Sequence, residues 1–227
     1  MAPAELRRRI AGRVAAPAQR GRRRIVGRVA APADLGRRSA GGGVEANELL
    51  TAAVGAVLLV LLAVEGVTIV FLRPLLFVHM FLGMLLVPVV LVKLASTGYR
   101  FVRYYAGARA FRAKGPPPIL LRVSAPVLVA TTLIVFATGT ALLVGGTSVR
   151  GTLLPIHKIS FIVWGPVFVL HILAHLPATV RALRPRPRRP GTAMRGGLVL
   201  AALLAGLVVA LVLAPDIAPW MHAHRRG

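Results

Sequence analysis

The chain has 227 residues and a formal net charge of +23 at pH 7, and 56% of its residues are hydrophobic. Ordinary soluble domains contain about 45–50% apolar residues, so this composition indicates a membrane protein. The chain contains no cysteine, which excludes disulfides, iron–sulfur clusters, thiolate metal sites and cysteine nucleophiles. It also contains no G-x-S-x-G, P-loop or H-E-x-x-H motif, so no hydrolase class is indicated.

Residues 1–47 are predicted to form a basic, disordered cytoplasmic tail that is rich in Ala, Arg, Gly and Pro. The tail contains a repeat, in which RRRIAGRVAAPAQRG at 7–21 is followed by RRRIVGRVAAPADLG at 22–36. The favoured interpretation is an extension that strengthens membrane orientation, with no specific nucleic-acid partner. The alternatives are a polybasic arm attracted to anionic lipid or to nucleic acid, and an organelle transit peptide.

Five long apolar runs follow the tail, at about residues 49–72, 75–96, 119–144, 153–176 and 197–214. Each run reaches or approaches the ~20 residues that a helix needs to cross a hydrocarbon layer of about 30 Å. The runs lack the period-two alternation of a membrane barrel, and lipid cannot bind free backbone N–H and C=O groups. The sequence therefore predicts an all-α integral membrane protein.

The predicted architecture is a bundle of four transmembrane helices at residues 48–177, with a fifth, C-terminal transmembrane helix at residues 196–214. A basic cytoplasmic loop at residues 178–195 connects the bundle to the fifth helix. Residues 215–227 are predicted to form a short external tail, of which MHAHRRG at 221–227 is expected to be solvated.

The placement of basic residues indicates the topology of the chain in the cell membrane. Eleven arginines precede the first apolar run, five basic residues lie between the second and third runs, and six arginines lie between the fourth and fifth. The alternate loops hold one arginine each, Arg73 and Arg150. The positive-inside rule then predicts a multi-pass protein with a cytoplasmic N-terminus and an external C-terminus.

Two features outside the central spans also predict local structure. Residues 98–118 alternate tyrosine with arginine, which favours an interfacial helix; the alternative is a site for a phosphate, carboxylate or quinone headgroup. The fifth span carries Ala202 and Gly206, a small-xxx-small pair that is typical of close helix packing. This span is nevertheless expected to be peripheral, because it holds no ionisable residue.

Ionisable residues inside membrane spans are costly, so each one is a candidate functional residue. The candidates in the spans are Glu65, His79, Lys93, His157, Lys158, His171 and His175. His79 and Lys93 are 14 residues apart, as are His157 and His171, and this spacing places each pair on one helix face about 21 Å apart in depth. Because spans two and four run in the same direction, His79 should face His157 near the outer side. Lys93 should face His171 near the inner side.

The two histidine-bearing stretches also resemble each other. HMFLGMLLVPVVLVK at 79–93 and HKISFIVWGPVFVLH at 157–171 share a histidine, eight residues, Pro-Val, three residues, and then Lys or His. This pattern indicates an internal duplication of a helical hairpin.

These residues resemble the four-helix transmembrane b-type cytochromes, a group that includes cytochrome b561-like proteins and the cytochrome subunits of formate dehydrogenases and hydrogenases. The resemblance covers about residues 49–177 and rests on histidine placement and helix count. It implies one haem b, with His79 and His157 as the axial ligands of the iron. It also implies electron transfer from a quinol-level donor to an unidentified redox partner, as in the electron-transfer subunit of a membrane oxidoreductase.

In this resemblance Lys93 stands where a second histidine would be expected, so Lys93, His171 and His175 define at most a degenerate second haem site. Lys93 is interpreted instead as a residue that extends its ammonium to the inner headgroups. Gly83, one turn from His79, and Gly139 in the third span could leave room for the macrocycle. 

Glu65 is the only acidic residue within a span. It could relay protons, orient a ligand histidine or pair with Lys158.

Two other functions remain open at this point. The first is a haem-free structural or assembly membrane protein derived from such a cytochrome, which the lysine at position 93 favours. The second is a small transporter, because Pro88 and Pro166 at matching offsets could break helices around a midplane site.

Overall fold

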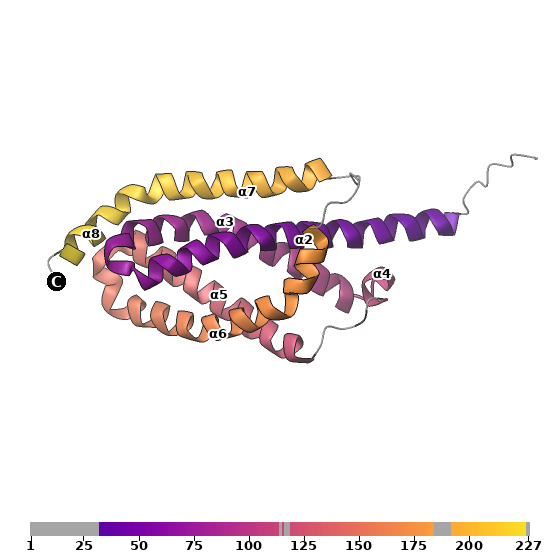
Figure 1. Cartoon of the computed structure of the whole chain (residues 1–227), viewed down its shortest axis with the longest axis horizontal. Coiled ribbons are helices and arrows are strands. Elements are labelled where there is room, and N and C mark those ends of the chain that lie inside the picture. The colour runs from indigo at the N-terminus through magenta and orange to yellow at the C-terminus, as the bar shows by residue number, and fades with distance from the viewer. Residues whose placement is uncertain (1–31, 114, 116–118, 184–191, 226–227) are drawn as a thin grey trace, which may run out of the picture. The chain divides into compact units, whose positions relative to one another are not determined.

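The computed structural model describes residues 32–113, 115, 119–183 and 192–225, and every regular element in these ranges is helical. The chain divides into two units, residues 1–36 and 37–227; of the first, only the helical residues 32–36 are described. The elements are α2 (Pro32–Val70), α3 (Leu72–Tyr105), α4 (Arg109–Arg112), α5 (Ile119–Gly145), η1 (Gly146–Val149), α6 (Arg150–Leu183), α7 (Thr192–Leu213), η2 (Ala214–Ile217) and α8 (Ala218–Arg225) (Figure 1). The prediction of an all-α protein is confirmed.

Within the described ranges, four apolar segments are long enough to cross a membrane: Gly43–Val70, Leu72–Tyr105, Ile119–Pro177 and Thr192–His222. The third segment has 59 residues and contains both α5 and α6, so these segments supply five long helices. Large apolar side chains face outward, such as Val70, which is 75% exposed, and Ile162, which is 68% exposed. Such an apolar exterior suits lipid, and the predicted multi-pass bundle of four helices plus a fifth is confirmed.

α2 and α3 form an antiparallel hairpin that turns at Phe71. Several polar contacts connect the two helices, and three of the pairs are centred on Phe71 or Leu72: Asn47 with Ser96, Thr51 with Lys93, and Glu65 with His79. Between the polar pairs, Val54 and Leu58 of α2 pack against Leu86 and Val89 of α3. The register of this hairpin therefore places Glu65 beside His79.

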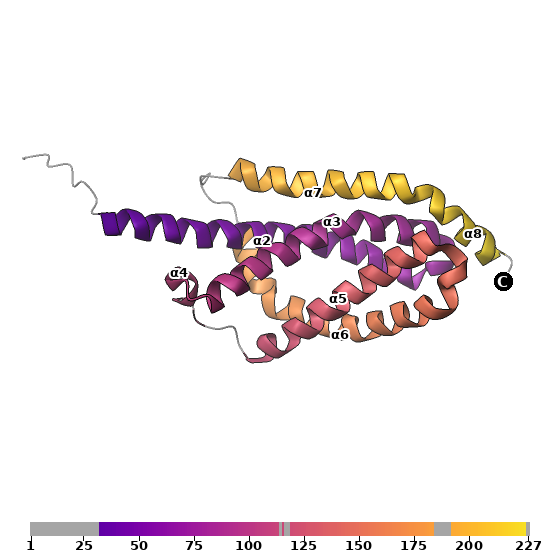
Figure 2. The same ribbon diagram turned by 180° about the vertical axis from the view of Figure 1, so that it is seen from behind.

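α5 and α6 form a second antiparallel hairpin, and the two helices run side by side in both views (Figure 1 and Figure 2). The turn is η1, where Gly146 has a φ of +67°, a conformation that glycine adopts without steric cost. The Trp164 indole N–H donates a hydrogen bond of 2.9 Å to the Thr132 hydroxyl across this hairpin. The turns of both hairpins lie at the same end of the 37–227 unit, which we call the hairpin end.

α7 packs along α3 through a stripe of small residues. Ala202, Gly206 and Ala210 are all buried, and a Cβ atom built on Gly206 would overlap the Leu85 carbonyl of α3. Small side chains allow two helix backbones to approach this closely. The prediction of close packing by Ala202 and Gly206 is confirmed, and α7 is an integral part of the unit.

Replacing Gly206 with alanine should therefore destabilise the protein, because the new methyl group meets backbone that cannot move aside. We expect a loss of roughly 1–3 kcal/mol in the free energy of unfolding, seen as a lower Tm by circular dichroism in detergent. Gly197→Ala, on the same helix, is the control, because its added methyl would meet nothing within 4 Å. Equal Tm values for the two variants would contradict this packing.

The C-terminal segment after α7 folds back on the bundle. Ile217 in η2 is 1% exposed, and Trp220 in α8 is 8% exposed, whereas His222 is exposed. η2 contacts α3 and α5, and α8 contacts η1 at the hairpin end. Ile217 and Trp220 therefore belong to the packed part of the chain, because both supply apolar surface that the bundle buries.

Two chain boundaries also differ from the sequence predictions. α2 begins at Pro32 and so includes residues 32–47 of the predicted tail, while residues 1–31, with most of the repeat, lie outside the described residues. α6 continues to Leu183 and α7 begins at Thr192, which shortens the predicted loop from both sides.

The predicted interfacial helix at residues 98–118 is not found in the described part of that segment. α3 continues to Tyr105, and α4 is a single turn that follows Gly107, which has a φ of +86°. The buried Phe111 of α4 packs edge-on against Tyr99, with ring centroids 5.9 Å apart. The aromatic residues of this connection therefore pack against the end of α3.

Candidate functional site

A cavity of about 540 Å³ lies between the two hairpins. This volume falls within the roughly 300–1,000 Å³ that is typical of small-molecule and cofactor sites. Its lining is apolar apart from a few polar side chains, among them Glu65, His79, His157 and Lys158. All four long helices of the hairpins contribute to the lining, so the cavity depends on how the hairpins pack together.

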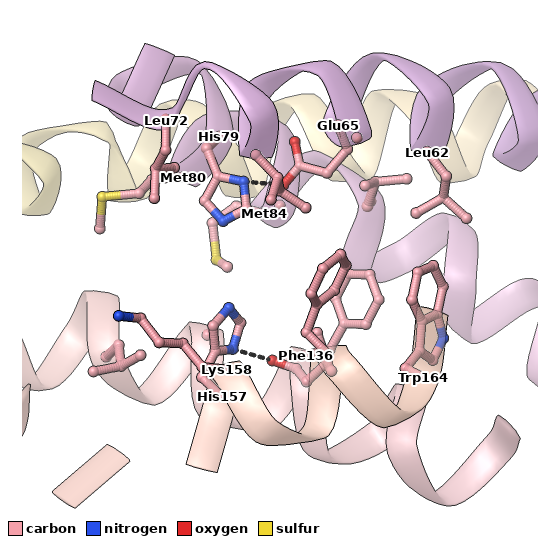
Figure 3. Close-up of a pocket in the computed structure, with 18 of the residues that line it drawn as sticks. Leu62, Glu65, Leu72, His79, Met80, Met84, Phe136, His157, Lys158 and Trp164 are labelled. Carbon is pink, nitrogen blue, oxygen red and sulfur yellow. Dashed lines mark hydrogen bonds and ion pairs between the residues drawn. The ribbon is translucent and has the colours of Figure 1, made fainter. Parts of the chain in front are cut away.

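His79 of α3 and His157 of α6 face each other across this cavity (Figure 3). Each imidazole points from its own hairpin toward the other, as the matching positions in the two sequence stretches predict. The structure therefore brings together the two residues that the sequence predicted to be opposite each other.

The His79 ring is held by the preceding helix of its own hairpin. Its Nδ1 atom lies 2.8 Å from Glu65 Oε1 and 3.1 Å from the Thr68 hydroxyl. Glu65 is 8% exposed and Thr68 is 2% exposed, and the Thr68 hydroxyl donates to the Glu65 backbone carbonyl at 2.6 Å. A carboxylate accepts hydrogen bonds, so Nδ1 carries the proton and Nε2 keeps its lone pair.

The His157 ring is held in the same way by α5. Its Nδ1 atom lies 3.1 Å from the Val135 carbonyl oxygen and 3.1 Å from the Thr138 hydroxyl. A carbonyl can only accept, so Nδ1 donates and Nε2 again keeps its lone pair. Each histidine thus bonds back to an acceptor and a threonine on the first helix of its hairpin, and both have a free Nε2.

The glycines near the site have different roles from one another. A Cβ atom on Gly139 would lie 3.2 Å from the His157 Cε1 atom, so Gly139 makes room for the histidine ring itself. A Cβ atom on Gly83 would lie 3.8 Å from Glu65 Oε1, an ordinary contact. Gly66 lines the cavity, and a Cβ atom there would meet nothing within 4 Å.

Lys93 lies in the interface between α2 and α3. Its ammonium donates a hydrogen bond of 2.8 Å to the Thr51 carbonyl, and a Cβ atom on Gly55 would lie 3.0 Å from Nζ. The interpretation that Lys93 extends to the headgroups is therefore wrong, because the ammonium binds α2 and Gly55 leaves space for it.

His171 and His175 form a separate pair on α6. Their ring centroids are 4.5 Å apart. Lys93 lies near enough for its positive charge to act on both rings. None of these three residues lines the cavity that holds His79 and His157. In the described part of the chain, no three His, Cys, Asp or Glu side chains are grouped so that they could hold a metal ion.

Glu65 and Lys158 do not pair with each other, contrary to one of the predicted options. Glu65 contacts His79 and Thr68, which matches the option that it orients a histidine. Lys158 lines the cavity and extends past His157, away from Trp164 and toward Leu72 (Figure 3).

Sequence reasoning missed four contributors to the site: Thr68, Thr138, the Val135 carbonyl and Trp220. Thr68 follows Glu65 by three residues, and Thr138 precedes Gly139, so both threonines could have been noticed as polar neighbours of candidates. A backbone carbonyl has no sequence signal. Trp220 lines the cavity from α8, beyond the last span, where nothing in the sequence pointed to the bundle.

The fold and the cavity define the class of protein as an all-α, multi-pass membrane protein with an apolar site between two helical hairpins. The chain matches no protein family model, no curated protein and no solved structure.

Removing the Lys93 side chain should destabilise the protein, because its stem and ammonium fill the interface between α2 and α3. We expect Lys93→Ala to lower the free energy of unfolding by roughly 1–3 kcal/mol, measured as a fall in Tm in detergent. Lys158→Ala, at an exposed position on α6, should change the stability by less than about 0.5 kcal/mol. Indistinguishable effects of the two substitutions would mean that Lys93 is not held in this interface.

Proposed function

We propose that this protein is a membrane b-type cytochrome that holds one haem b between α3 and α6 and transfers electrons. One observation carries the proposal. Two imidazoles from opposite hairpins face each other across an apolar cavity, and each has its Nδ1 hydrogen-bonded and its Nε2 free. An imidazole whose other nitrogen is fixed by an acceptor is a well-oriented ligand for iron.

The number of protein ligands also favours a haem over a bare metal ion. Two histidines alone leave most positions of a metal ion unfilled, whereas a haem brings its own ring nitrogens, so His79 and His157 would be enough to hold it. When bound, the haem supplies a one-electron carrier. Glu65 and the Val135 carbonyl would hold the two rings in place, while the apolar lining would exclude water.

Lys93 supports a single haem in the described bundle. Its ammonium is hydrogen-bonded to the Thr51 carbonyl in the α2–α3 interface and does not line the cavity. An amine must lose its proton before it can bind a metal. His79 and His157 would hold this single haem, which would supply one-electron transfer between a quinol-level donor and a redox partner. The basic residues favour an orientation with the N-terminus in the cytoplasm of a cell membrane.

The proposal predicts the absorbance spectrum of a haem with two histidine ligands. The purified full chain should show a Soret band and, after reduction with dithionite, a sharp alpha band. His79→Ala and His157→Ala should each lose most of the bound haem, because each removes an axial ligand. His175→Ala should keep it, because His175 does not line the cavity.

A purified wild-type protein without haem absorbance would reject the cytochrome. That result would leave the alternative of a haem-free structural or assembly protein derived from one. A loss of haem in His175→Ala equal to that in His79→Ala would show that the cavity has been assigned the wrong ligands.

Glu65 should also set the reduction potential. A carboxylate bound to Nδ1 increases the basicity of the imidazole and adds a negative charge, which both favour oxidised iron. Glu65→Gln should therefore raise the midpoint potential, on the order of the 59 mV that corresponds to a tenfold change for one electron. Redox titration followed by absorbance measures this shift.

The control for Glu65→Gln is Asp216→Asn, which makes the same chemical change at an exposed residue outside the cavity. Its midpoint potential should stay close to that of the wild type. A Glu65→Gln protein that keeps its haem and its wild-type potential would mean that the carboxylate does not act on the ligand.

A further inference from the structure

Four arginines gather where α3 ends and α4 follows it, toward the end of the 37–227 unit that is opposite the hairpin end (Figure 1 and Figure 2). We call them the arginine surface: Arg100, Arg103, Arg109 and Arg112, all of which are exposed. Residues 93–113 contain no aspartate or glutamate. Within the described part of the chain, none of the four arginines forms a salt bridge. The surface therefore carries a positive charge that no neighbouring carboxylate neutralises.

The short helix α4 folds back on α3 and brings two of these arginines together. Phe111 of α4 packs against Tyr99 of α3, with ring centroids 5.9 Å apart. The Arg103 guanidinium lies over the same Phe111 ring, with its Cζ atom 5.9 Å from the ring centroid. The Arg112 Nε–H donates a hydrogen bond of 3.3 Å to the Tyr104 carbonyl. Both guanidinium groups are therefore held near the last turns of α3, although the two residues are well separated in the sequence.

Arg103 and Arg112 keep hydrogen-bond donors for a further partner. A guanidinium carries five N–H donors in a planar fork, and the Tyr104 carbonyl accepts only one bond from Arg112. Glu45 and Glu48 of α2 lie toward the same end of the hairpin, and each has an interaction of its own. The planar fork matches the oxygen atoms of a phosphate, which it can bind through two parallel hydrogen bonds. The two arginines therefore suit a phosphate group that approaches from outside the bundle.

The length of α3 places the arginine surface at the level of the lipid headgroups. α3 has 34 residues and is about 51 Å long, whereas the hydrocarbon layer is about 30 Å thick. The C-terminal part of α3 therefore extends past that layer. In this part Phe101 is 62% exposed and Tyr105 is 56% exposed. Exposed aromatic rings beside arginines are typical of the boundary between hydrocarbon and headgroups, where apolar and charged groups both find partners.

We propose that the arginine surface is a binding site for the headgroup of an anionic phospholipid, with Arg103 and Arg112 on the phosphate. The exposed rings of Phe101 and Tyr105 lie against the acyl chains, which neither a soluble phosphate nor a nucleic acid would supply. Under the topology that the basic residues favour, this lipid belongs to the cytoplasmic leaflet, which carries anionic lipids. The inference is independent of the proposed haem, because none of these residues lines the cavity.

The test measures lipid binding to the purified full chain in detergent by native mass spectrometry. Phosphatidylglycerol, which is anionic, is compared with phosphatidylcholine of the same acyl chains, which has no net charge. The wild-type protein should bind phosphatidylglycerol roughly tenfold more tightly than phosphatidylcholine. Arg103→Gln and Arg112→Gln should each weaken the binding of phosphatidylglycerol by roughly fivefold, because each removes one positive charge at the headgroup. The binding of phosphatidylcholine should change much less.

Matched controls separate this site from the total charge of the protein. Arg73→Gln and Arg150→Gln remove the same charge from exposed residues at the hairpin end, so each should keep the preference for phosphatidylglycerol. Phe111→Ala keeps every charge and removes the ring beneath Arg103, so it should weaken the binding of phosphatidylglycerol. Arg103→Gln leaves the hydrogen bond of Arg112 in place and tests the site even if Phe111→Ala disturbs the fold of α4.

Several outcomes would overturn the lipid site. One is a wild-type protein that binds the two lipids equally. Another is a loss of phosphatidylglycerol binding in Arg73→Gln or Arg150→Gln that equals the loss in Arg103→Gln, which would show an effect of total charge. Displacement of phosphatidylglycerol by an equal concentration of glycerol 3-phosphate would show a site for a soluble phosphate. Displacement by an equal concentration of a short single-stranded RNA would show a nucleic-acid surface.

Discussion

The hydrocarbon layer of a membrane offers no partner to a polar group, and each polar group in the spans must find one inside the protein. The backbone meets this demand by forming helices. Several polar side chains meet it by pairing across helices, as Lys93 does with the Thr51 carbonyl and His79 with Glu65. Because these pairs are symmetric about the turn at Phe71, they set the register of the first hairpin and thereby the position of the site.

In the second hairpin a different kind of acceptor binds the histidine Nδ1 atom. His79 has a carboxylate on Nδ1, whereas His157 has the Val135 backbone carbonyl, and a threonine hydroxyl accompanies both. The two rings therefore have the same tautomer but unequal surroundings, since one carries a nearby negative charge and the other does not. This correspondence extends the sequence repeat to three dimensions and is consistent with duplication of a hairpin.

The third part of the molecule, α7 with η2 and α8, packs on the hairpins through small and apolar side chains. The small side chains of Ala202, Gly206 and Ala210 bring α7 against α3, and this contact carries the C-terminal segment to the hairpin end. As a result Trp220, which lies far from both histidines in the sequence, lines their cavity. α7 thus completes the lining of the cavity by positioning the segment that follows it.

The sequence by itself determined the helical class, the number of long helices and the facing of His79 and His157, because hydrophobic length and helical periodicity are local properties. Only the tertiary structure decided the acceptor on each Nδ1, the inward placement of the Lys93 ammonium and the burial of Trp220. Sequence periodicity indicates which face of its own helix a side chain occupies. It does not show which helix packs against that face or how closely, and these two facts decided which acceptor each histidine Nδ1 meets and where the cavity lies.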